Sequence, residues 1–242
     1  MYTIEPSLTL VFAPMYNTGK KKDATGAFQP EAKRFCEYHG IDKENLILID
    51  NKKPKYMQKA AVLDRIADEG PGSIDSLVFF CHGFRSGFQF GFKLKDANDL
   101  AACVEDSTID YEFDDVGPSL IFYSCDMARD LDRDRDDDTQ EFGGDGGMAD
   151  TIRDALCVHG MVNCRVVAHS TTGHTDKNPY AKFFDGQGSP IGGVGGQMPV
   201  SRKSPLWKSW VHNLRKSKTF RFAFPYMTIG DVHTWLLEHP PQ

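Results

Sequence analysis

A histidine and a cysteine follow two similar apolar runs of the chain at matching positions. Residues 76–83 read SLVFFCHG and residues 119–126 read SLIFYSCD, so that His82 and Cys125 each stand directly after the run. A cysteine attacks carbonyl carbons as a thiolate, and a neighbouring histidine can remove the thiol proton. Gly83 adds a residue without a side chain, whose N–H could face a substrate carbonyl. This chemistry requires that the fold bring His82 and Cys125 together.

The pattern of apolar residues predicts strands that alternate with helices. The apolar runs lack the polar alternation of a half-exposed sheet, which favours a parallel sheet covered by helices on both faces, an α/β fold. We expect the strands and the intervening helices over the following residues: strands 8–13, 45–50, 76–81, 119–124 and 164–170, and helices 31–40, 53–70, 96–106 and 146–160.

This arrangement predicts that His82 and Cys125 lie close together. The 42 residues between them contain one crossover helix, which is enough to make their two strands parallel and adjacent. The carboxyl ends of parallel strands meet at one edge of the sheet, and neighbouring strands lie about 5 Å apart. An imidazole and a thiol at equivalent heights would then come within hydrogen-bonding reach.

Composition favours a single globular domain over residues 1–242. The chain has 40% hydrophobic residues, no signal-like presequence, and no apolar run near the roughly 18 residues that a membrane span needs. Six scattered cysteines do not suggest a disulfide framework. We therefore expect a cytoplasmic protein with no membrane partner. Its core would cover about residues 8–175, and residues 176–242 would form a glycine-rich loop and a basic C-terminal extension.

The two runs resemble the motifs of the caspase-like (clan CD) cysteine peptidases, which include caspases, metacaspases, legumains, clostripain and the bacterial CHAT proteases. The resemblance is carried by FFCHG over residues 79–83 and FYSC over residues 122–125, and residues 148–170 are similar to the helix and strand that follow the nucleophile in CHAT-type members. It covers roughly residues 8–175. It implies a three-layer sandwich with a mostly parallel sheet, and a protein or peptide substrate.

The resemblance also implies roles for individual residues. Cys125 would be the nucleophile, His82 the general base and acid, and the N–H groups of Gly83 and Cys125 the oxyanion hole, with no cofactor needed for the chemistry. The chain departs from caspases and metacaspases where Asp126 follows the cysteine. It also has Tyr123 two positions before the cysteine, where metacaspases and legumains place an acid that recognises basic P1 side chains. Residues near the same sheet edge would bind substrate: Tyr123, Ser124, Asp126, His169, Ser170 and His174.

An acidic run after Cys125 predicts either a calcium site or a cleavage loop. Residues 130–141 contain seven acids and two arginines, within a chain of net charge −6. Six of the acids stand at offsets 1, 3, 5, 7, 9 and 12, the ligand positions of an EF-hand loop, although Arg135 replaces the glycine at offset 6. These are Asp130, Asp132, Asp134, Asp136, Asp138 and Glu141. Members of the family that the chain resembles include some that depend on calcium and some that are activated by loop cleavage, which is why both a calcium site and a cleavage loop are considered. An activating or regulatory protein partner is a further possibility that the resemblance implies.

The basic segment 201–221 has seven basic residues and no acid. Its Trp207, Trp210 and Leu214 stand at helical spacing, which favours packing against the core, so nucleic acid is not an expected partner.

Two alternatives to the peptidase remain. CHGF after a strand is also similar to the oxyanion corner of an α/β-hydrolase, in which case Ser170, Asp231 and His233 or His239 would form an esterase triad. The G-x-S-x-G elbow and the helix after it are missing, however. The second alternative keeps the caspase-like fold without catalysis, as a binding or regulatory module.

Overall fold

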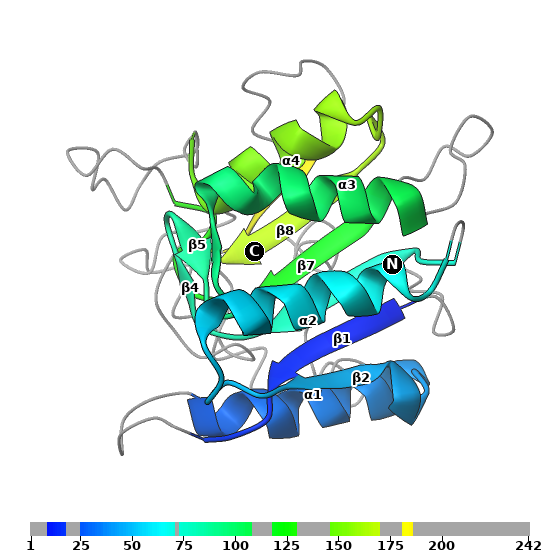
Figure 1. Cartoon of the computed structure of the whole chain (residues 1–242), viewed down its shortest axis with the longest axis vertical. Coiled ribbons are helices and arrows are strands. Elements are labelled where there is room, and N and C mark those ends of the chain that lie inside the picture. The colour runs from blue at the N-terminus through cyan, green and yellow to red at the C-terminus, as the bar shows by residue number, and fades with distance from the viewer. Residues whose placement is uncertain are drawn as a thin grey trace, which may run out of the picture.

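The computed structural model describes residues 9–17, 25–70, 73–107, 118–129, 146–169 and 181–185, and the structural statements below refer to these residues (Figure 1). Nine strands are present: β1 (Thr9–Pro14), β2 (Leu46–Ile49), β3 (Ser76–Phe80), β4 (Gly83–Phe84), β5 (Gly87–Phe88), β6 (Phe92–Lys93), β7 (Ser119–Tyr123), β8 (Arg165–His169) and β9 (Ala181–Asp185). The α-helices are α1 (Thr25–His39), α2 (Lys55–Ala67), α3 (Ala97–Ser107) and α4 (Met148–Val158), and the 3₁₀ helices are η2 (Lys43–Asn45) and η3 (Leu94–Asp96). Within this described part, no helix combines the length and the apolar character needed to cross a membrane.

The central sheet has six strands in the order β2-β1-β3-β7-β8-β9. The first five run parallel, and β9 pairs antiparallel with β8 at one edge. The predicted α/β fold with a mostly parallel sheet is therefore confirmed. A separate three-stranded antiparallel sheet, β4-β5-β6, follows β3 directly.

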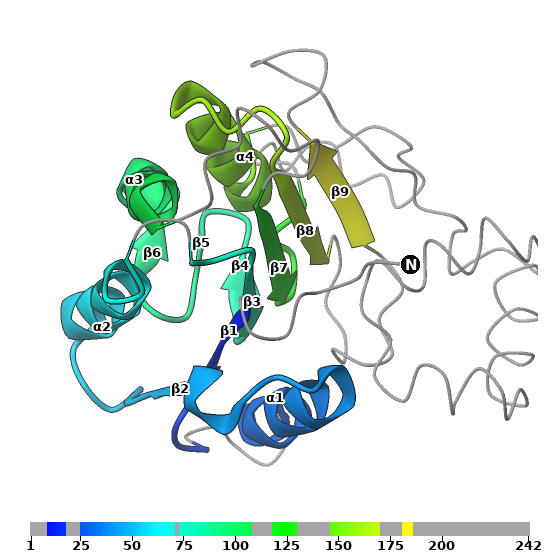
Figure 2. The same cartoon turned by 90° about the vertical axis from the view of Figure 1, so that its right-hand side faces the viewer.

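Helices cover both faces of the sheet (Figure 2). One buried cluster joins α1 to alternate residues of β1, β3, β7 and β8. A larger cluster, on the opposite face of the sheet, joins α2, α3 and α4 to the other alternate residues of the same strands. Two faces buried at once explain why the strand sequences are apolar without alternation, because no face of β1, β3 or β7 meets water.

A row of phenylalanines sets the register of the three central strands. Phe12, Phe79 and Phe122 are direct partners across β1, β3 and β7. Their rings stack, with centroids 5.0 Å apart between Phe12 and Phe79 and 4.8 Å apart between Phe79 and Phe122. Phe88 of the small sheet packs against Phe79 and Phe122, with centroids at 5.4 and 5.3 Å. The row thus fixes the central strands and anchors the small sheet to them.

The strands and helices named above all appear, with ends shifted by a few residues. The structure adds the small sheet and β9, which the sequence pattern does not predict. Helix α1 begins at Thr25, six residues before the predicted start, and continues through Pro30. The small sheet and β9 had not been predicted, because two-residue strands are too short to show a period and β9 stands alone after a loop. With β9, residues assigned to the C-terminal extension join the main sheet.

Truncation of Phe79 tests the role of this row. Phe79→Ala removes a fully buried ring that contacts Phe12, Phe88 and Phe122, and should lower the free energy of unfolding by about 3–5 kcal/mol. The measurement is urea denaturation followed by circular dichroism. Phe84→Ala is the matched control: its side chain is 58% exposed, and the expected change is within about 0.5 kcal/mol. Equal losses in the two variants would contradict the assigned core.

Candidate active site

His82 and Cys125 lie beyond the carboxyl ends of two neighbouring parallel strands. The last register pair of β3 and β7 joins Phe80 to Tyr123, and each chain then continues two residues to reach His82 or Cys125. Because neighbouring strands lie about 5 Å apart, this register brings the two residues to the same height at one sheet edge. Both are partly exposed. The predicted adjacency of their strands is confirmed.

Gly83 packs directly against the segment that carries the cysteine. A Cβ atom on Gly83 would lie 2.5 Å from the carbonyl oxygen of Cys125, 2.6 Å from the Cβ of Ser124 and 2.7 Å from the Cγ of Met127. Only a residue without a side chain allows so close an approach of the two backbones. The segments His82-Gly83 and Ser124-Cys125 therefore touch each other.

The main chain of His82 is held by Gln89 from the small sheet. The N–H of His82 donates to Oε1 of Gln89 at 3.1 Å, and the N–H of Gln89 donates back to the carbonyl of His82 at 2.8 Å. The ammonium of Lys55, in the first turn of α2, donates to the carbonyl of Gln89 at 2.5 Å. This chain of hydrogen bonds fixes the backbone of His82 from two sides.

The imidazole of His82 lies on the face of the sheet that α1 covers. Its ring meets Phe28 of α1 edge-on, with centroids 5.0 Å apart and an interplanar angle of 85°. Phe28 belongs to the same buried cluster as Phe80 and Tyr123. The early start of α1, which the sequence pattern missed, thus supplies the surface against which the histidine ring rests.

The turn after Cys125 reverses the chain through an unusual backbone conformation. Asp126 has φ of 56°, in the left-handed region, where aspartate is among the few side chains that occur with any frequency. The next two residues, Met127 and Ala128, are fully buried in the cluster beneath α2, α3 and α4. The guanidinium of Arg129 lies 3.8 Å from the carboxylate of Asp126. The sharp reversal leaves Cys125 at the sheet edge while its successors anchor in the core.

The start of α4 holds the loops after β3 and β7 together. The N–H of Met148 donates to the carbonyl of Arg85 at 2.7 Å, and the N–H of Ala149 donates to the carbonyl of Met127 at 3.0 Å. These bonds use helix-terminal N–H groups that have no partner inside the helix. The N–H of Ala128 adds a bond to the carbonyl of His169 at 3.0 Å. Three elements thus fix the geometry of the candidate site.

A buried ion pair supports that helix end. The guanidinium of Arg153 donates to Asp150 at 2.5 Å, and both side chains are almost completely buried. Asp150 also accepts a hydrogen bond from the N–H of Gly146 at 3.0 Å, ahead of the helix. A carboxylate at a helix N-terminus interacts favourably with the helix dipole, so Asp150 fixes the first turn of α4 electrostatically as well as by hydrogen bonding.

Cys81 differs from Cys125 although it precedes His82 directly. Its side chain is fully buried on the opposite face of the sheet, with Sγ 3.3 Å from Oγ of Ser124. Burial raises the pKa of the Cys81 thiol to about 12, although the contact with Ser124 lowers it. Cys81 therefore stays protonated near neutral pH, which makes Cys125 the better candidate nucleophile of the two.

The other predicted substrate-binding residues divide into buried residues and residues outside the described part. Tyr123 is 2% exposed and stacks on Phe80, with centroids 4.4 Å apart. Ser124 and His169 are also buried, and Asp126 alone of the described set is partly exposed. Ser170 and His174 lie outside the described residues.

The metal prediction and the esterase alternative also fall largely outside the described residues. All six acids of the predicted calcium loop do so: Asp130, Asp132, Asp134, Asp136, Asp138 and Glu141. Asp231, His233 and His239 of the esterase alternative lie outside as well. In the part of the chain that the structure describes, no group of three or more histidine, cysteine or acidic residues is arranged to hold a metal ion. Calcium binding stays a prediction.

Sequence reasoning missed Gln89 and Lys55 as supports of the site. A signal was available in GFRSGFQFGF, residues 83–92, where Gly-Phe recurs every four residues. These glycines and phenylalanines build the small sheet, and Gly91 has φ of 94°, a conformation that side chains disfavour. The hydrogen bond between Gln89 and His82 depends on the geometry of the hairpin, and the repeat alone does not specify that geometry.

Comparisons with protein-family models, with curated proteins and with solved structures give no match. Cys125 and His82 are partly exposed residues that stand two positions beyond the ends of adjacent parallel strands, and Gly83 packs on the segment of the cysteine. A thiol and an imidazole are the groups that nucleophilic attack on a carbonyl uses.

Alkylation rates test the distinction between the cysteines. With a pKa of about 12, Cys81 is thiolate to only about one part in ten thousand at pH 8, and Cys36, whose pKa burial also raises to about 12, behaves alike. Cys125, being accessible, should react with iodoacetamide at least about a hundred times faster than either, as measured by peptide mass spectrometry. The urea-unfolded protein, in which all the thiols react, is the control. Slower labelling of Cys125 than of Cys81 in the folded protein would contradict the assignment.

Proposed function

We propose that the protein is a cysteine endopeptidase in which Cys125 is the nucleophile and His82 the general base and acid. The observation that carries the proposal is the register of β3 and β7 together with the contact of Gly83 on Cys125. This register supports a placement of the Cys125 thiol and the His82 imidazole at the carboxyl ends of β3 and β7, on the same face of the sheet. A six-stranded sheet with five parallel strands and helices on both faces also agrees with the caspase-like sandwich that the sequence resemblance implies.

The reaction would proceed through a thioester. His82 accepts the proton of the Cys125 thiol as sulfur attacks the carbonyl carbon of the scissile peptide bond, and the carbonyl oxygen becomes an oxyanion. N–H groups of Gly83 and Cys125 stabilise this charge. The intermediate collapses, the C–N bond breaks, and His82 returns the proton to the leaving amine. Water, deprotonated by His82, then attacks the thioester and releases the carboxylic acid and the thiol.

Tyr123, two positions before the cysteine, would not contact the P1 side chain of the substrate. The burial of Tyr123 beneath α1 argues against such a role. Asp126 follows the nucleophile, lies beside Arg129 and has a side chain that is 25% exposed, which makes it the better candidate for a polar contact with substrate. Activation by calcium or by cleavage within residues 130–141 belongs to the same proposal.

Substitution of the two proposed catalytic residues tests the function. Cys125→Ala removes the nucleophile and His82→Ala removes the base, so each should lower kcat/KM for peptide hydrolysis by about 10⁴-fold or more. Activity is measured on a panel of fluorogenic peptides that differ at P1. Covalent capture by matched peptide acyloxymethyl ketones, located by mass spectrometry, identifies the attacking residue.

Matched variants separate the alternatives. Cys81→Ala removes a neighbouring thiol on the other face and should leave most of the hydrolysis, and so should Ser170→Ala. Full activity of Cys125→Ala would end the peptidase proposal. Loss of ester hydrolysis in Ser170→Ala alone would favour the esterase, and a wild-type protein that neither cleaves nor is labelled would favour a binding module.

Gln89 should act as a positioning residue for His82. Gln89→Met keeps the length of the side chain but removes the acceptor for the N–H of His82, and should lower kcat/KM by about ten- to a hundred-fold through misplacement of the imidazole. Gln89→Glu retains an acceptor oxygen and should recover most of the activity.

The control for Gln89 is a hydrogen bond of similar kind elsewhere. Ser107→Ala removes a buried bond from Oγ to the carbonyl of Ile66, at 3.1 Å, far along the chain from the site. Its cost in stability should be about 1 kcal/mol, with kcat/KM unchanged. Equal activity in Gln89→Met and the wild type, or equal loss in Gln89→Met and Gln89→Glu, would remove the positioning role.

A further inference from the structure

The first turn of α2 lies directly against the turn that follows β5 in the small sheet. A Cβ atom on Gly91 would lie 2.4 Å from the carbonyl oxygen of Lys55, so the two backbones touch there. The side chain of Lys55 makes a second contact, because its ammonium donates to the carbonyl of Gln89 at 2.5 Å. Helix α2 and the small sheet are thus joined beside the candidate site by one main-chain contact and one hydrogen bond.

Lys55 holds its ammonium against the protein, although the residue as a whole is exposed. A lysine side chain at the surface normally extends into water, since ordering it costs rotamer entropy and its ammonium is strongly hydrated. Here the ammonium bonds to Gln89 and also lies 3.4 Å from Oε1 of Gln58. Loss of hydration at this position lowers the pKa of Lys55 below its usual value. Hydrogen bonds from a charged donor are roughly twice as strong as neutral ones, so the bond to Gln89 stabilises the turn after β5.

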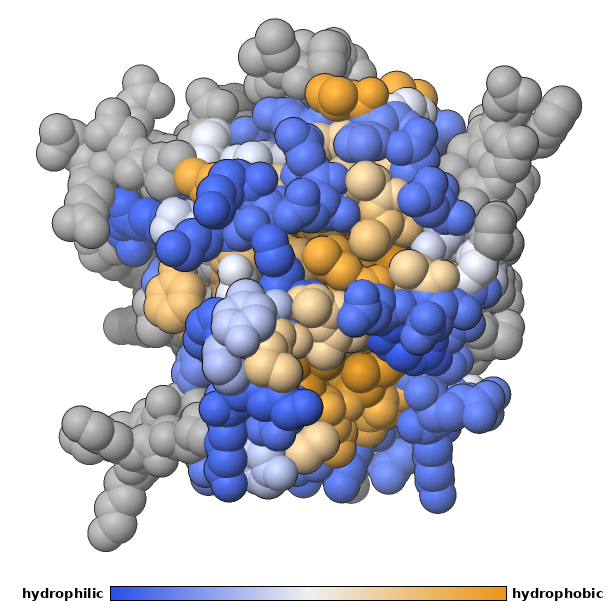
Figure 3. All heavy atoms as spheres, viewed as in Figure 1, coloured by the Kyte–Doolittle hydropathy of each residue, from blue (hydrophilic) through white to orange (hydrophobic). Residues whose placement is uncertain are grey.

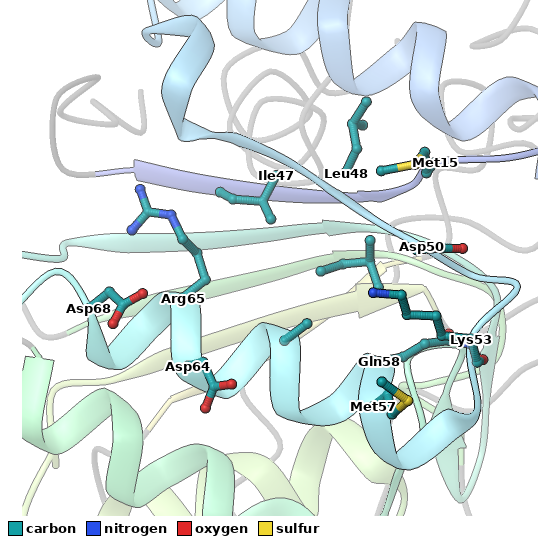
Figure 4. A pocket seen from close by; sticks show the side chains of 12 residues that line it. Met15, Ile47, Leu48, Asp50, Lys53, Met57, Gln58, Asp64, Arg65 and Asp68 are labelled. Atoms are coloured by element: carbon teal, nitrogen blue, oxygen red, sulfur yellow. The ribbon is translucent and has the colours of Figure 1, made fainter.

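The start of α2 is itself held in place, so Lys55 reaches Gln89 from a fixed position. Gln58, further along the helix, is buried, and its Nε2 donates to the carbonyl of Lys53 at 2.6 Å. Gln58 lines the groove between α2 and β2 that Figure 4 shows. Val62 and Ile66 of the same helix are fully buried in the core, and Figure 3 shows apolar side chains gathered between α2 and β2.

Gln89 transmits the support of α2 to His82. The N–H of Gln89 donates to the carbonyl of His82 at 2.8 Å, and Oε1 of Gln89 accepts from the N–H of His82 at 3.1 Å. The strands of the small sheet are only two residues long, and strands this short provide few hydrogen bonds of their own. The position of Gln89 therefore depends on contacts from outside the small sheet, and the bond from Lys55 is one of them.

We propose that Lys55 is a positioning residue for the proposed catalytic pair, His82 and Cys125. Its ammonium holds Gln89, Gln89 holds the main chain of His82, and the imidazole is thereby kept at the height of Cys125. This role rests on the proposed function, in which His82 removes the thiol proton of Cys125. It extends the support of the site to α2, whose preceding strand β2 is separated from β3 by β1 in the sheet. Lys55 acts through Gln89 and takes no part in the chemical steps.

The pH dependence of Cys125 alkylation measures whether His82 is in place. An imidazole that accepts the thiol proton maintains a thiolate at a pH where an ordinary thiol, with a pKa of about 8.5, is protonated. In the wild type, iodoacetamide should therefore label Cys125 readily at pH 6, and His82→Ala should lower that rate by about a hundredfold. Labelling is located and quantified by peptide mass spectrometry. This readout requires no knowledge of the natural substrate.

Lys55→Met is the test variant, since it keeps the length of the side chain and removes the donor to Gln89. It should lower the rate of Cys125 labelling at pH 6 by about tenfold, and kcat for peptide hydrolysis by a similar factor, with KM changed less than about twofold. Lys55→Arg retains a cationic donor and should recover most of both rates. Because Lys55 is exposed, neither substitution should unfold the protein, which urea denaturation verifies.

Lys59→Met is the matched control on the same helix. It removes two ion pairs, to Asp96 at 2.7 Å and to Asp99 at 3.1 Å, which join α2 to η3 and α3. Labelling of Cys125 at pH 6 and kcat should each stay within about twofold of the wild type. A general loss of helix anchoring would affect Lys59→Met and Lys55→Met alike, whereas a positioning role affects Lys55→Met alone.

A double variant tests the route through Gln89. Lys55→Met and Gln89→Met both loosen the hold on His82 through the same residue. The double variant should therefore lose less labelling rate and less kcat than the product of the two single losses.

The outcomes distinguish the role of Lys55 from the proposed function. If His82→Ala is labelled at pH 6 as fast as the wild type, the catalytic pair itself is wrong, and the role of Lys55 falls with it. If His82→Ala slows labelling but Lys55→Met does not, or if Lys59→Met slows it as much as Lys55→Met, the positioning role is overturned while the peptidase proposal stands. Losses that multiply in the double variant overturn the positioning role too.

Discussion

The parallel register between β3 and β7 is the constraint on which the rest of the site depends. Phe79 faces Phe122 on one side of the sheet and Phe80 faces Tyr123 on the other, and both pairs stack. A slip of one residue would separate both pairs and turn every side chain of the strand to the wrong face. The same register, carried two residues further, brings His82 level with Cys125. Core packing and the proposed chemistry therefore rest on one alignment of two strands.

Strand register fixes height but does not fix the loops beyond the strand ends. Three neighbouring structures do so: Gln89 of the small sheet bonds the main chain of His82, the first N–H groups of α4 bond the loops after β3 and β7, and β8 bonds the turn after Cys125. Each uses backbone groups that would otherwise lie unpaired near the sheet edge. The turn that carries Cys125 is thus supported from several directions.

The two edge strands of the main sheet, β9 and β2, differ in how far they are buried. At one edge β9 pairs antiparallel with β8, and its Phe184 is buried in the core. At the other edge β2 remains partly exposed beside an apolar groove with charged ends. An unprotected edge strand tends to associate, so natural sheets cover or charge such edges.

The sequence by itself predicted the layered α/β fold, its main strands and the adjacency of the two strands that lead to His82 and Cys125. Those conclusions follow from periodicity and spacing, since runs such as SLVFF and SLIFY are apolar on both faces and one crossover helix separates them. The tertiary structure alone decided the burial of Tyr123 and His169, the role of Gln89, and the groove beside β2. These depend on which side chains meet across distant segments, as when Phe28 reaches His82 from a helix that begins earlier than its pattern suggests. Local sequence carries no signal for such contacts, because packing between elements creates them.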